Sequence, residues 1–535
     1  MARHFALFVL AAVLLLTTVF VPTPFGADDI KRHRPHRTLC ADLANLDLPD
    51  TLITLAQEIA AGPFPFGDLE PTCSSDIASP ELPAFCRIIG VIAPAITFEL
   101  WLPLQGWNGK FQMYGNHGFA GNIEYSDMGP QLVRGYAIAG TDTGHAGSAP
   151  LPWMRDPQQV EDYGHRGVHE VTVKSKVIVR AFYGRPPKYS YFNGCSTGGK
   201  QGLTEAQRYP ADYDGIITGD PNFAQIHNRA QYVWNGQVTF ANPDTTIPAI
   251  KLPLINNAVI AACDAIDGVL DGVIDDPRRC DFPPQSLLCS EGQDPNTCLS
   301  AAQVGALENV YAGPRNPRTG EQVYPGLVRG SERGWGGHVT GPNIFPTADQ
   351  FFRWMVFNDP NWDYKQFDFD TDLGFADANF SAIIDAIDPD LRAFERQGGK
   401  ILHYHNWGST VHTAPRSIEY YEEVLSFLRG ARSSDDALEK TREFYRLFLV
   451  PGGSGSNAPT TFDPVPYLER WVERGIPPKR ILASHSTDGV VDRTRPLCPY
   501  PEVAVYRGRG STDEAANFVC RNPHDRDRHH GDDGQ

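Results

Sequence analysis

The sequence lacks an excess of basic residues. It has 47 Lys and Arg against 64 Asp and Glu, which gives a formal net charge of −17 over 535 residues. Proteins that bind nucleic acid or anionic membranes gather Lys and Arg on one surface, so a chain this acidic is not expected to bind either. The acidic balance by itself indicates only a soluble protein.

The first 27 residues have the pattern of a secretory signal peptide. Arg3 and His4 begin it, residues 5–20 are almost all apolar, and Gly26-Ala27 offers small residues at a cleavage point. An uncleaved membrane anchor is the alternative interpretation. Cleavage would leave a secreted or periplasmic protein that no longer contacts the membrane.

Ten cysteines in an exported chain favour disulfide bonds, although the sequence does not determine how they pair. The pairs proposed from closeness in sequence are Cys40 with Cys86, Cys263 with Cys280, Cys289 with Cys298, and Cys498 with Cys520. Cys73 and Cys195 have no obvious partner, and their pairing stays open.

The chain is organised around a G-x-S-x-G pentapeptide, GCSTG, with Ser196 at its centre. The aromatic run 189–192 before it favours a strand, and the run 200–208 after it favours a helix. A strand, a tight glycine-flanked turn and a helix are the context that a nucleophile elbow requires. Glycines are needed there because the serine is strained and neighbouring side chains would clash.

Other segments have the periodicity of strands and helices. Predicted strands are 96–103, 111–114, 136–140, 215–218, 400–405 and 446–450, and predicted helices are 165–182 and 417–428. Strands and helices in alternation imply a mostly parallel sheet with covering helices. The glycine-rich turn 115–121 either directs N–H groups at a developing oxyanion or simply connects two strands.

The chain is too long for one simple core, so we expect one large domain with an insertion, or two domains. The predicted parts are a signal peptide (1–27), a sheet domain in two pieces (28–220 and 390–521), an inserted lid (221–389) and a disordered tail (522–535). Aromatic residues cluster in the lid between 351 and 367. They would suit a flat aromatic ligand, but most of them are expected to form the lid's own core.

The lid contains closely spaced carboxylates, at Asp264, Asp267 and Asp271, with glycines between them. Such carboxylates repel one another unless a hard cation neutralises them, and Ca²⁺ prefers carboxylate and backbone oxygens. The spacing is not that of an EF-hand. We expect a structural calcium loop, bracketed by Cys263 and Cys280; an acidic surface turn is the alternative.

From about residue 82 to 521 the chain resembles the tannase and feruloyl esterase family of α/β-hydrolases. The resemblance rests on LPAFCRIIG, WNGKF, GNHGFAG, YAIAGTDTGHAG, YGHRGVHE, GCSTGGKQG, CDAIDGVLDGVIDDPRRC, RPLCPYP and AANFVC. It implies an α/β-hydrolase fold with a large inserted lid domain. It also implies a secreted esterase of phenolic acids with a Ser-Asp-His triad, a structural Ca²⁺ and a disulfide beside the triad.

The resemblance also implies roles for individual residues. Ser196 would be the nucleophile, and the N–H groups of Thr197 and of the 116–118 turn, with His117 at its centre, would form the oxyanion hole. The calcium ligands would be the carboxylates of Asp264, Asp267 and Asp271 and the carbonyls of Val269 and Val273.

Two segments, with three positions, depart from this family pattern. The family's acid ends a His-Gly-Trp-Ala-Asp segment, which here reads HNWGS, so Ser409 stands where Asp is expected. The family's base lies in a Pro-Gly-x-Gly-His-Cys segment, which here reads PGGSGS. Gly455 therefore replaces the histidine, and Ser456 replaces the cysteine that would bond Cys195.

These replacements matter because a serine hydroxyl is a poor nucleophile unless an oriented base takes its proton. His412 is the first candidate for a substitute base, since its loop should lie near the site. His405 and His485 are expected to be structural or surface histidines.

Two functions therefore remain open. The first is a secreted serine esterase of phenolic esters with weak hydrolysis. The second is a pseudoenzyme that binds an aromatic or carbohydrate ester, or another aromatic ligand, without efficient hydrolysis. A non-hydrolytic enzyme that reuses the same pocket is a third possibility.

Overall fold

The computed structural model describes residues 38–63, 81–147, 152–240, 242–430, 433–453 and 457–522. Residues 1–36 lie outside the described residues, and the described residues belong to one compact unit. The predicted signal peptide, Cys73, Gly455, Ser456 and the tail beyond Asn522 also lie outside the described residues.

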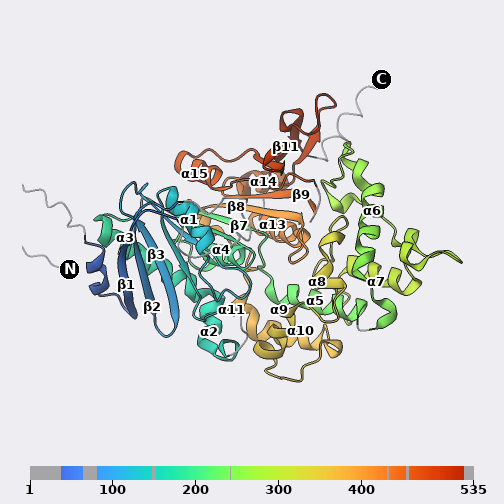
Figure 1. The fold of residues 1–535 in the computed structure, drawn as a ribbon, viewed down its shortest axis with the longest axis horizontal. Coiled ribbons are helices and arrows are strands. Elements are labelled where there is room, and N and C mark those ends of the chain that lie inside the picture. The colour runs from blue at the N-terminus through green and yellow to red at the C-terminus, as the bar shows by residue number, and fades with distance from the viewer. Residues whose placement is uncertain are drawn as a thin grey trace, which may run out of the picture. The chain divides into compact units, whose positions relative to one another are not determined.

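A mixed sheet, nine-stranded within the described residues, is the centre of the fold (Figure 1). Its order is β1-β2-β3-β5-β4-β6-β7-β8-β9. β1, β2, β3 and β5 pair antiparallel, and the remaining pairs are parallel. The strands are β1 (Thr51–Ile59), β2 (Phe85–Ile92), β3 (Ile96–Pro103), β4 (Lys110–Tyr114), β5 (Ala137–Thr141), β6 (Tyr189–Cys195), β7 (Gly215–Gly219), β8 (Lys400–Gly408) and β9 (Tyr445–Gly453).

Every predicted strand is present, β3 with its predicted bounds and the others with shifted ends, and the order confirms the predicted α/β-hydrolase fold. β5 and β7 are buried along their whole length, so their sequences contain apolar or small residues rather than an alternation of apolar and polar ones. β1 and β2 were not predicted.

Helices cover both faces of the sheet (Figure 1). α4 and α13 pack with the face that carries Phe192 and Ile216, whereas α15 packs with the face that carries Tyr191 and Ile217. The helices are α1 (Tyr125–Val133), α2 (Pro157–Glu161), α3 (Gly167–Tyr183), α4 (Thr197–Arg208), α5 (Gln225–Thr239), α6 (Leu252–Cys263), α7 (Ala301–Ala312), α8 (Gly336–Val339), α9 (Pro346–Gln350), α10 (Thr371–Ala376), α11 (Ala382–Ile384), α12 (Arg392–Arg396), α13 (Ala414–Arg429), α14 (Ser434–Arg442) and α15 (Val465–Arg474).

The long stretch between β7 and β8 is consistent with the predicted inserted lid. Helices α6 and α7 and residues around Trp335 form an apolar cluster of their own. Phe351, Phe352 and Phe367 are buried in the main core cluster, so these lid rings serve packing. The stretch Pro243–Asp267 is long and apolar enough to cross a membrane by composition, but core helices of soluble proteins pass the same test.

The four predicted disulfides are present: Cys40–Cys86, Cys263–Cys280, Cys289–Cys298 and Cys498–Cys520. Cys195, which had no obvious partner in the sequence, is also disulfide-bonded, to a partner outside the described residues. The strand that ends in the pentapeptide is therefore covalently tied to another part of the chain.

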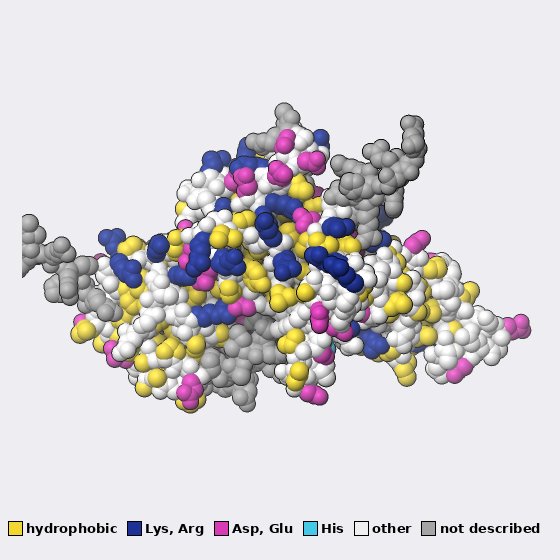
Figure 2. Space-filling view, turned by 90° about the horizontal axis from the view of Figure 1, so that it is seen from above, with side chains coloured by type: hydrophobic (Ala, Val, Ile, Leu, Met, Phe, Trp, Pro, Cys, Tyr) yellow, Lys and Arg dark blue, Asp and Glu magenta, His cyan; other side chains and the backbone are white. Residues whose placement is uncertain are grey.

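The C-terminal region adds two hairpins to the sheet domain. β10 (Ile481–Thr487) pairs with β11 (Val490–Leu497), and β12 (Val503–Tyr506) pairs with β13 (Phe518–Arg521). Figure 2 shows that Lys and Arg side chains gather across the middle of one face of the molecule. The net charge of −17 is therefore not spread evenly over the surface.

Candidate functional site

Ser196 lies in the turn between β6 and α4, at the carboxyl edge of the sheet. Its backbone has φ 60° and ψ −119°, a region that L-residues rarely adopt. The Ser196 N–H donates to the Gly219 carbonyl at 2.9 Å, and the Ser196 carbonyl accepts from the Asn222 N–H at 3.0 Å. A Cβ on Gly194 would lie 2.6 Å from the Gly198 backbone. The turn is therefore a glycine-dependent elbow, as its sequence predicted.

The turn after β4 lies directly against the elbow. The Gly198 N–H donates to the Asn116 carbonyl at 2.6 Å, and Thr197 Oγ1 donates to the Gly118 carbonyl at 2.6 Å. These two bonds bring the predicted oxyanion turn and the first turn of α4 together.

Not every N–H group of this turn is available for an oxyanion. The Asn116 N–H donates to Gln201 Oε1 at 3.0 Å, and the His117 N–H donates to Glu124 Oε1 at 3.3 Å. The N–H groups of Gly118 and Thr197 have no acceptor among the described residues. The geometry therefore favours Gly118 over His117 as the partner of Thr197.

Ser409, the residue expected at the position of the family's acid, lies just after β8. Ser409 Oγ accepts from the His412 N–H at 3.4 Å, so it is part of a local turn. A carboxylate does lie nearby: Asp220, which directly follows β7, accepts from the Asn406 N–H at 2.7 Å and lies 3.5 Å from His405 Nε2. Burial raises the pKa of Asp220. Gly455, the residue expected at the position of the family's base, lies outside the described residues.

The predicted substitute base, His412, is buried near this turn. Its carbonyl accepts from His405 Nε2 at 2.8 Å. Burial, followed by the charges of His405, Arg229 and His338, lowers the pKa of His412 well below its usual value. Among the described residues, no imidazole nitrogen forms a hydrogen bond with Ser196 Oγ.

The other two histidines have structural partners, as expected. His405 Nδ1 lies 2.7 Å from Ser417 Oγ, and His485 Nδ1 lies 2.6 Å from Asp492 Oδ1. Neither ring contributes to the Ser196 site.

The acidic loop between α6 and Cys280 is folded around its own carboxylates. Asp264 Oδ1 accepts from the N–H groups of Asp271 and Gly272, at 3.2 and 3.0 Å. Asp267 Oδ1 accepts from the Val269 N–H at 2.8 Å. The loop thus holds the expected carboxylates within one tight turn.

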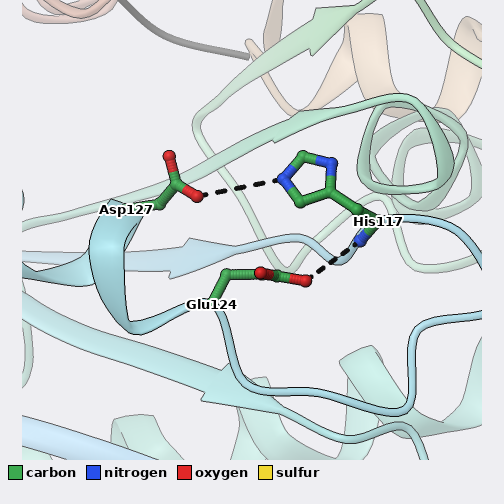
Figure 3. A group of neighbouring side chains, drawn as sticks. All are labelled: His117, Glu124 and Asp127. Carbon is green, nitrogen blue, oxygen red and sulfur yellow. Dashed lines mark hydrogen bonds and ion pairs between the residues drawn. The ribbon is translucent and has the colours of Figure 1, made fainter. Parts of the chain in front are cut away.

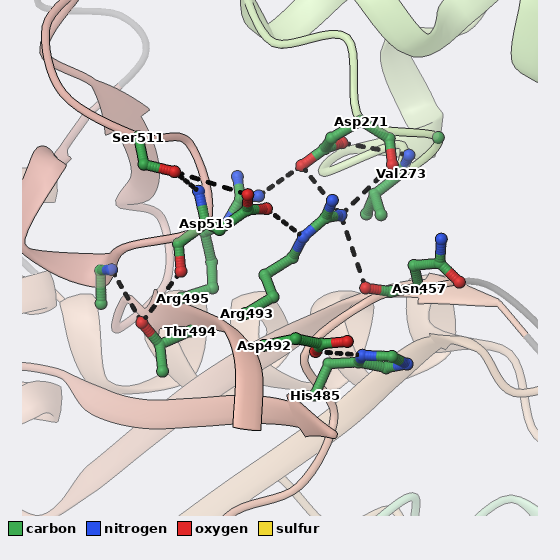
Figure 4. Close-up of polar contacts among 12 residues, drawn as sticks. Asp271, Val273, Asn457, His485, Asp492, Arg493, Thr494, Arg495, Ser511 and Asp513 are labelled. Atoms are coloured by element: carbon green, nitrogen blue, oxygen red, sulfur yellow. Dashed lines mark hydrogen bonds and ion pairs between the residues drawn. The ribbon is translucent and has the colours of Figure 1, made fainter. Parts of the chain in front are cut away.

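Figure 4 shows how the C-terminal hairpin meets this loop at Asp271. The Asp271 carboxylate pairs with Arg495 and lies 3.4 Å from Arg493 Nη1. Arg495 is 1% exposed, and its guanidinium lies 4.1 Å from the centre of the Phe518 ring. Neither arginine was singled out by the sequence, because each lies more than 200 residues from Asp271.

The chemistry of the loop fits a hard cation. Burial and neighbouring carboxylates raise the pKa of Asp267 to about 6 and that of Asp275 to about 7. Asp275 Oδ1 is buried and has no hydrogen-bond partner among the described residues. Carboxylates that are this crowded gain the most from Ca²⁺, which prefers oxygen ligands. The sequence prediction did not include Asp275.

A cavity of about 370 Å³ lies between the lid and the ends of β8 and β9. Its wall includes Asn256, Arg329, Arg333, Trp407, Gly408 and Gly452. It therefore adjoins the position of the family's acid, and its volume is in the range of small-molecule sites. An aromatic wall and two guanidinium groups suit a ligand with a flat ring and oxygen acceptors.

Comparison with known proteins finds esterases that are similar to this chain along almost its whole length. The family model "Tannase and feruloyl esterase" matches residues 84–521. An uncharacterized esterase of Xanthomonas campestris pv. campestris is 40% identical, over 90% of this chain and 91% of its own length. A probable feruloyl esterase B-1 of Neosartorya fischeri is 32% identical, over 83% of this chain and 87% of its own. The crystal structure of feruloyl esterase B from Aspergillus oryzae superposes with a TM-score of 0.80 at 27% identity, over 89% of this chain and 98% of that one.

Proposed function

Because this chain belongs to the tannase and feruloyl esterase family, and is by that membership a carboxylic ester hydrolase, we propose that it cleaves esters of phenolic acids at Ser196, with slow turnover. The observation that carries this proposal is the elbow. Ser196 stands at its strained tip, beside two N–H groups, of Gly118 and Thr197, that have no acceptor among the described residues.

The geometry supports a conventional first step. Ser196 Oγ would attack the ester carbonyl carbon, and the carbonyl oxygen would take up negative charge beside the Gly118 and Thr197 N–H groups. The acyl group would then stay on Ser196 while the alcohol leaves, and water would release the acid in a second step. Each step moves one proton to or from an oxygen atom, so each one needs a base or an acid.

The proton transfer is expected to limit the rate of this reaction. By the resemblance of the HNWGS and PGGSGS segments, Ser409 and Gly455 would stand where the family has its acid and its base. Loss of a triad member leaves a rate of only about 10³–10⁴-fold over water, contributed by the oxyanion hole and by binding. We therefore expect turnover several orders of magnitude below that of an intact triad.

A second candidate function is ligand binding without efficient hydrolysis. It is favoured by the absence, among the described residues, of an imidazole bonded to Ser196 Oγ. The cavity walled by Trp407, Arg329 and Arg333 would then hold an aromatic or carbohydrate ester. A non-hydrolytic enzyme that reuses the pocket would require the same cavity.

We further propose that the acidic loop holds a structural Ca²⁺. Its ligands would be the carboxylates of Asp264, Asp267 and Asp271 and the carbonyls of Val269 and Val273. The bound ion would neutralise the crowded carboxylates and stabilise the lid. The four disulfides fit a protein of an oxidising compartment, outside the cytoplasm.

A serine-directed fluorophosphonate probe, read by mass spectrometry, tests the esterase proposal. The parent chain should be labelled at Ser196 faster than the same serine in unfolded chain, and Ser196→Ala should be unlabelled and inactive on ethyl ferulate and methyl gallate. Absence of labelling, together with retained binding of these esters by calorimetry, would support the binding function instead.

The variant His412→Ala tests whether His412 acts as the base for Ser196. If His412 takes the proton, its removal should lower turnover of the phenolic esters to the level of Ser196→Ala. If turnover is unchanged, His412 has no part in the reaction, and the remaining rate comes from the elbow alone.

A further inference from the structure

A second cluster of ionisable side chains lies beside the elbow, on the sheet face opposite α4. It consists of His117 in the turn after β4, Glu124 just before α1, and Asp127 in the first turn of α1. One ligand atom of each lies within 4.8 Å of the other two (Figure 3). None of the three has a part, as a side chain, in the ester chemistry proposed above.

Asp127 is the anomalous member of the cluster. Its side chain is 1% exposed, and among the described residues the Tyr114 hydroxyl is a neighbouring donor that lies outside hydrogen-bond geometry for either carboxylate oxygen. Figure 3 shows the carboxylate directed at the His117 ring. A buried carboxylate without hydrogen bonds costs several kcal/mol, about 1–3 or more for each unsatisfied group. A partner that binds the Asp127 carboxylate would offset this cost.

The spacing of the cluster is that of ligands around a metal ion. His117 Nε2 lies 3.8 Å from Asp127 Oδ2, which is too far for a hydrogen bond. On a tetrahedral zinc ion with ligand bonds of about 2.0–2.2 Å, two ligand atoms lie about 3.3–3.6 Å apart. A shift of a few tenths of an ångström would therefore bring both atoms onto one ion. Glu124 uses Oε1 to accept from the His117 N–H, which leaves Oε2 available.

The charge of the cluster also favours a cation. Among the described residues, no Lys or Arg forms an ion pair with Glu124 or Asp127, so only the His117 ring can offset two carboxylates. The neighbouring Tyr114 adds no positive charge. Burial, with Asp127 beside it, raises the pKa of Tyr114 well above its usual value, so Tyr114 stays a neutral hydroxyl.

A cluster of the same composition elsewhere in the chain differs in having a lysine, Lys176, beside its carboxylates, although Glu205 is 1% exposed and neither of its oxygens has a hydrogen-bond partner among the described residues. His169, Glu205 and Asp212 also lie within ligand distance of one another. There, however, His169 Nδ1 is hydrogen-bonded to Asp212 at 2.7 Å, and the Lys176 ammonium donates to the Asp212 carbonyl. The lysine already supplies the positive charge, so this cluster is a matched control.

We propose that His117, Glu124 and Asp127 bind a divalent transition-metal ion of the Zn²⁺ or Mn²⁺ class, next to the nucleophile elbow. One imidazole and two carboxylates are ligands that both ions accept. The site is separate from the acidic lid loop, whose all-oxygen ligands suit Ca²⁺. It is linked to the elbow by the carbonyls on either side of His117, which accept from Thr197 Oγ1 and the Gly198 N–H.

The test is metal binding by the full chain, measured apart from activity. Chelated protein is first given excess Ca²⁺ to fill the lid loop, and Zn²⁺ or Mn²⁺ is then titrated by calorimetry, with metal content measured by mass spectrometry. The C-terminal tail contains His524, His529 and His530 and can bind Zn²⁺ by itself, so the result is read as a difference between variants.

The parent should bind one more ion per chain than Asp127→Asn, and Glu124→Gln should weaken that site at least tenfold. His169→Gln, at the control cluster, should bind as the parent does. In chelator, Asp127→Asn should melt no lower than the parent, because it removes an uncompensated charge. In Zn²⁺ it should lack the rise in melting temperature that the parent shows. Equal stoichiometry in the parent and Asp127→Asn, or a melting temperature of the variant that is lower in chelator, would overturn the proposal.

Discussion

Arg495 offers a way to test the calcium loop without changing any of its ligands. Its guanidinium is 1% exposed and pairs with Asp271, which is itself a proposed ligand. Replacing Arg495 by Met keeps the volume but removes the positive charge. In calcium-free protein Asp271 would then lose its main partner. With calcium bound, the ion would compensate the carboxylate instead.

The expected magnitude follows from these contacts. Removing one partner of a buried ion pair costs about 3–5 kcal/mol. Arg493 Nη1 remains 3.4 Å from Asp271 and partly compensates it, so we expect less than this range, about 2–3 kcal/mol, in chelator. The lost contact with Phe518 costs about 1 kcal/mol whether or not calcium is present. The penalty of Arg495→Met should therefore be about 2 kcal/mol larger in chelator than in calcium.

The assay is urea unfolding of the parent and Arg495→Met, each in calcium and in chelator. Arg495→Lys is the matched control, because it keeps the charge beside Asp271 and should show a small penalty in both conditions. If Arg495→Met loses the same free energy of unfolding with and without calcium, Asp271 does not bind the ion and the ligand assignment is wrong.

Two further predictions concern stability. Gly219→Ala would place a Cβ against the Tyr404 ring and should cost about 1–3 kcal/mol of unfolding free energy. Gly337→Ala, whose Cβ would find its nearest atom at 3.7 Å, should cost far less, and equal losses in urea would contradict the clash. Burial alone would lower the pKa of His227, but the hydrogen bond and charge of Asp377 raise it. A raised histidine pKa stabilises the folded state below about pH 6.5, and this stabilisation is lost as the pH rises through the folded value. Asp377→Asn should therefore cost more at pH 5.5 than at pH 8.5, and a penalty independent of pH would refute the pairing.

The strands that could be predicted are those whose sequence directly reflects their burial. β7 and β8 lie inside the parallel part of the sheet, where residues of both faces are buried, and each has adjacent apolar residues, Ile216-Ile217 and Ile401-Leu402. β1 lies at the edge, and most of its side chains are at least partly exposed. Its register also shifts between Ile53 and Leu55. An irregular edge strand has no alternating pattern, so the sequence of β1 carried no usable signal.

The features of the site also differ in how far the sequence predicts them. The elbow could be predicted because its glycines and Ser196 are adjacent in sequence and each is required by local backbone geometry. The contact of Arg495 with Asp271 could not, because it joins residues 224 positions apart. The approach of Asp127 to His117 depends on how α1 packs against the β4 turn, which is a tertiary event. Asp220 had one available clue, its position directly after a predicted strand of the parallel sheet.

The elbow and the catalytic base are physically separable in this protein. The strain at Ser196, of order 1–3 kcal/mol, is held by bonds to Gly219 and Asn222 and by the contact of the first turn of α4 with the β4 turn. None of these contacts involves an imidazole, so an elbow of this kind persists whether or not a base is present. A well-formed elbow is therefore evidence for the fold and for oxyanion stabilisation, but not for a reactive hydroxyl. This is why the rate of phosphonate labelling, rather than the structure of the elbow, discriminates between slow ester cleavage and binding alone.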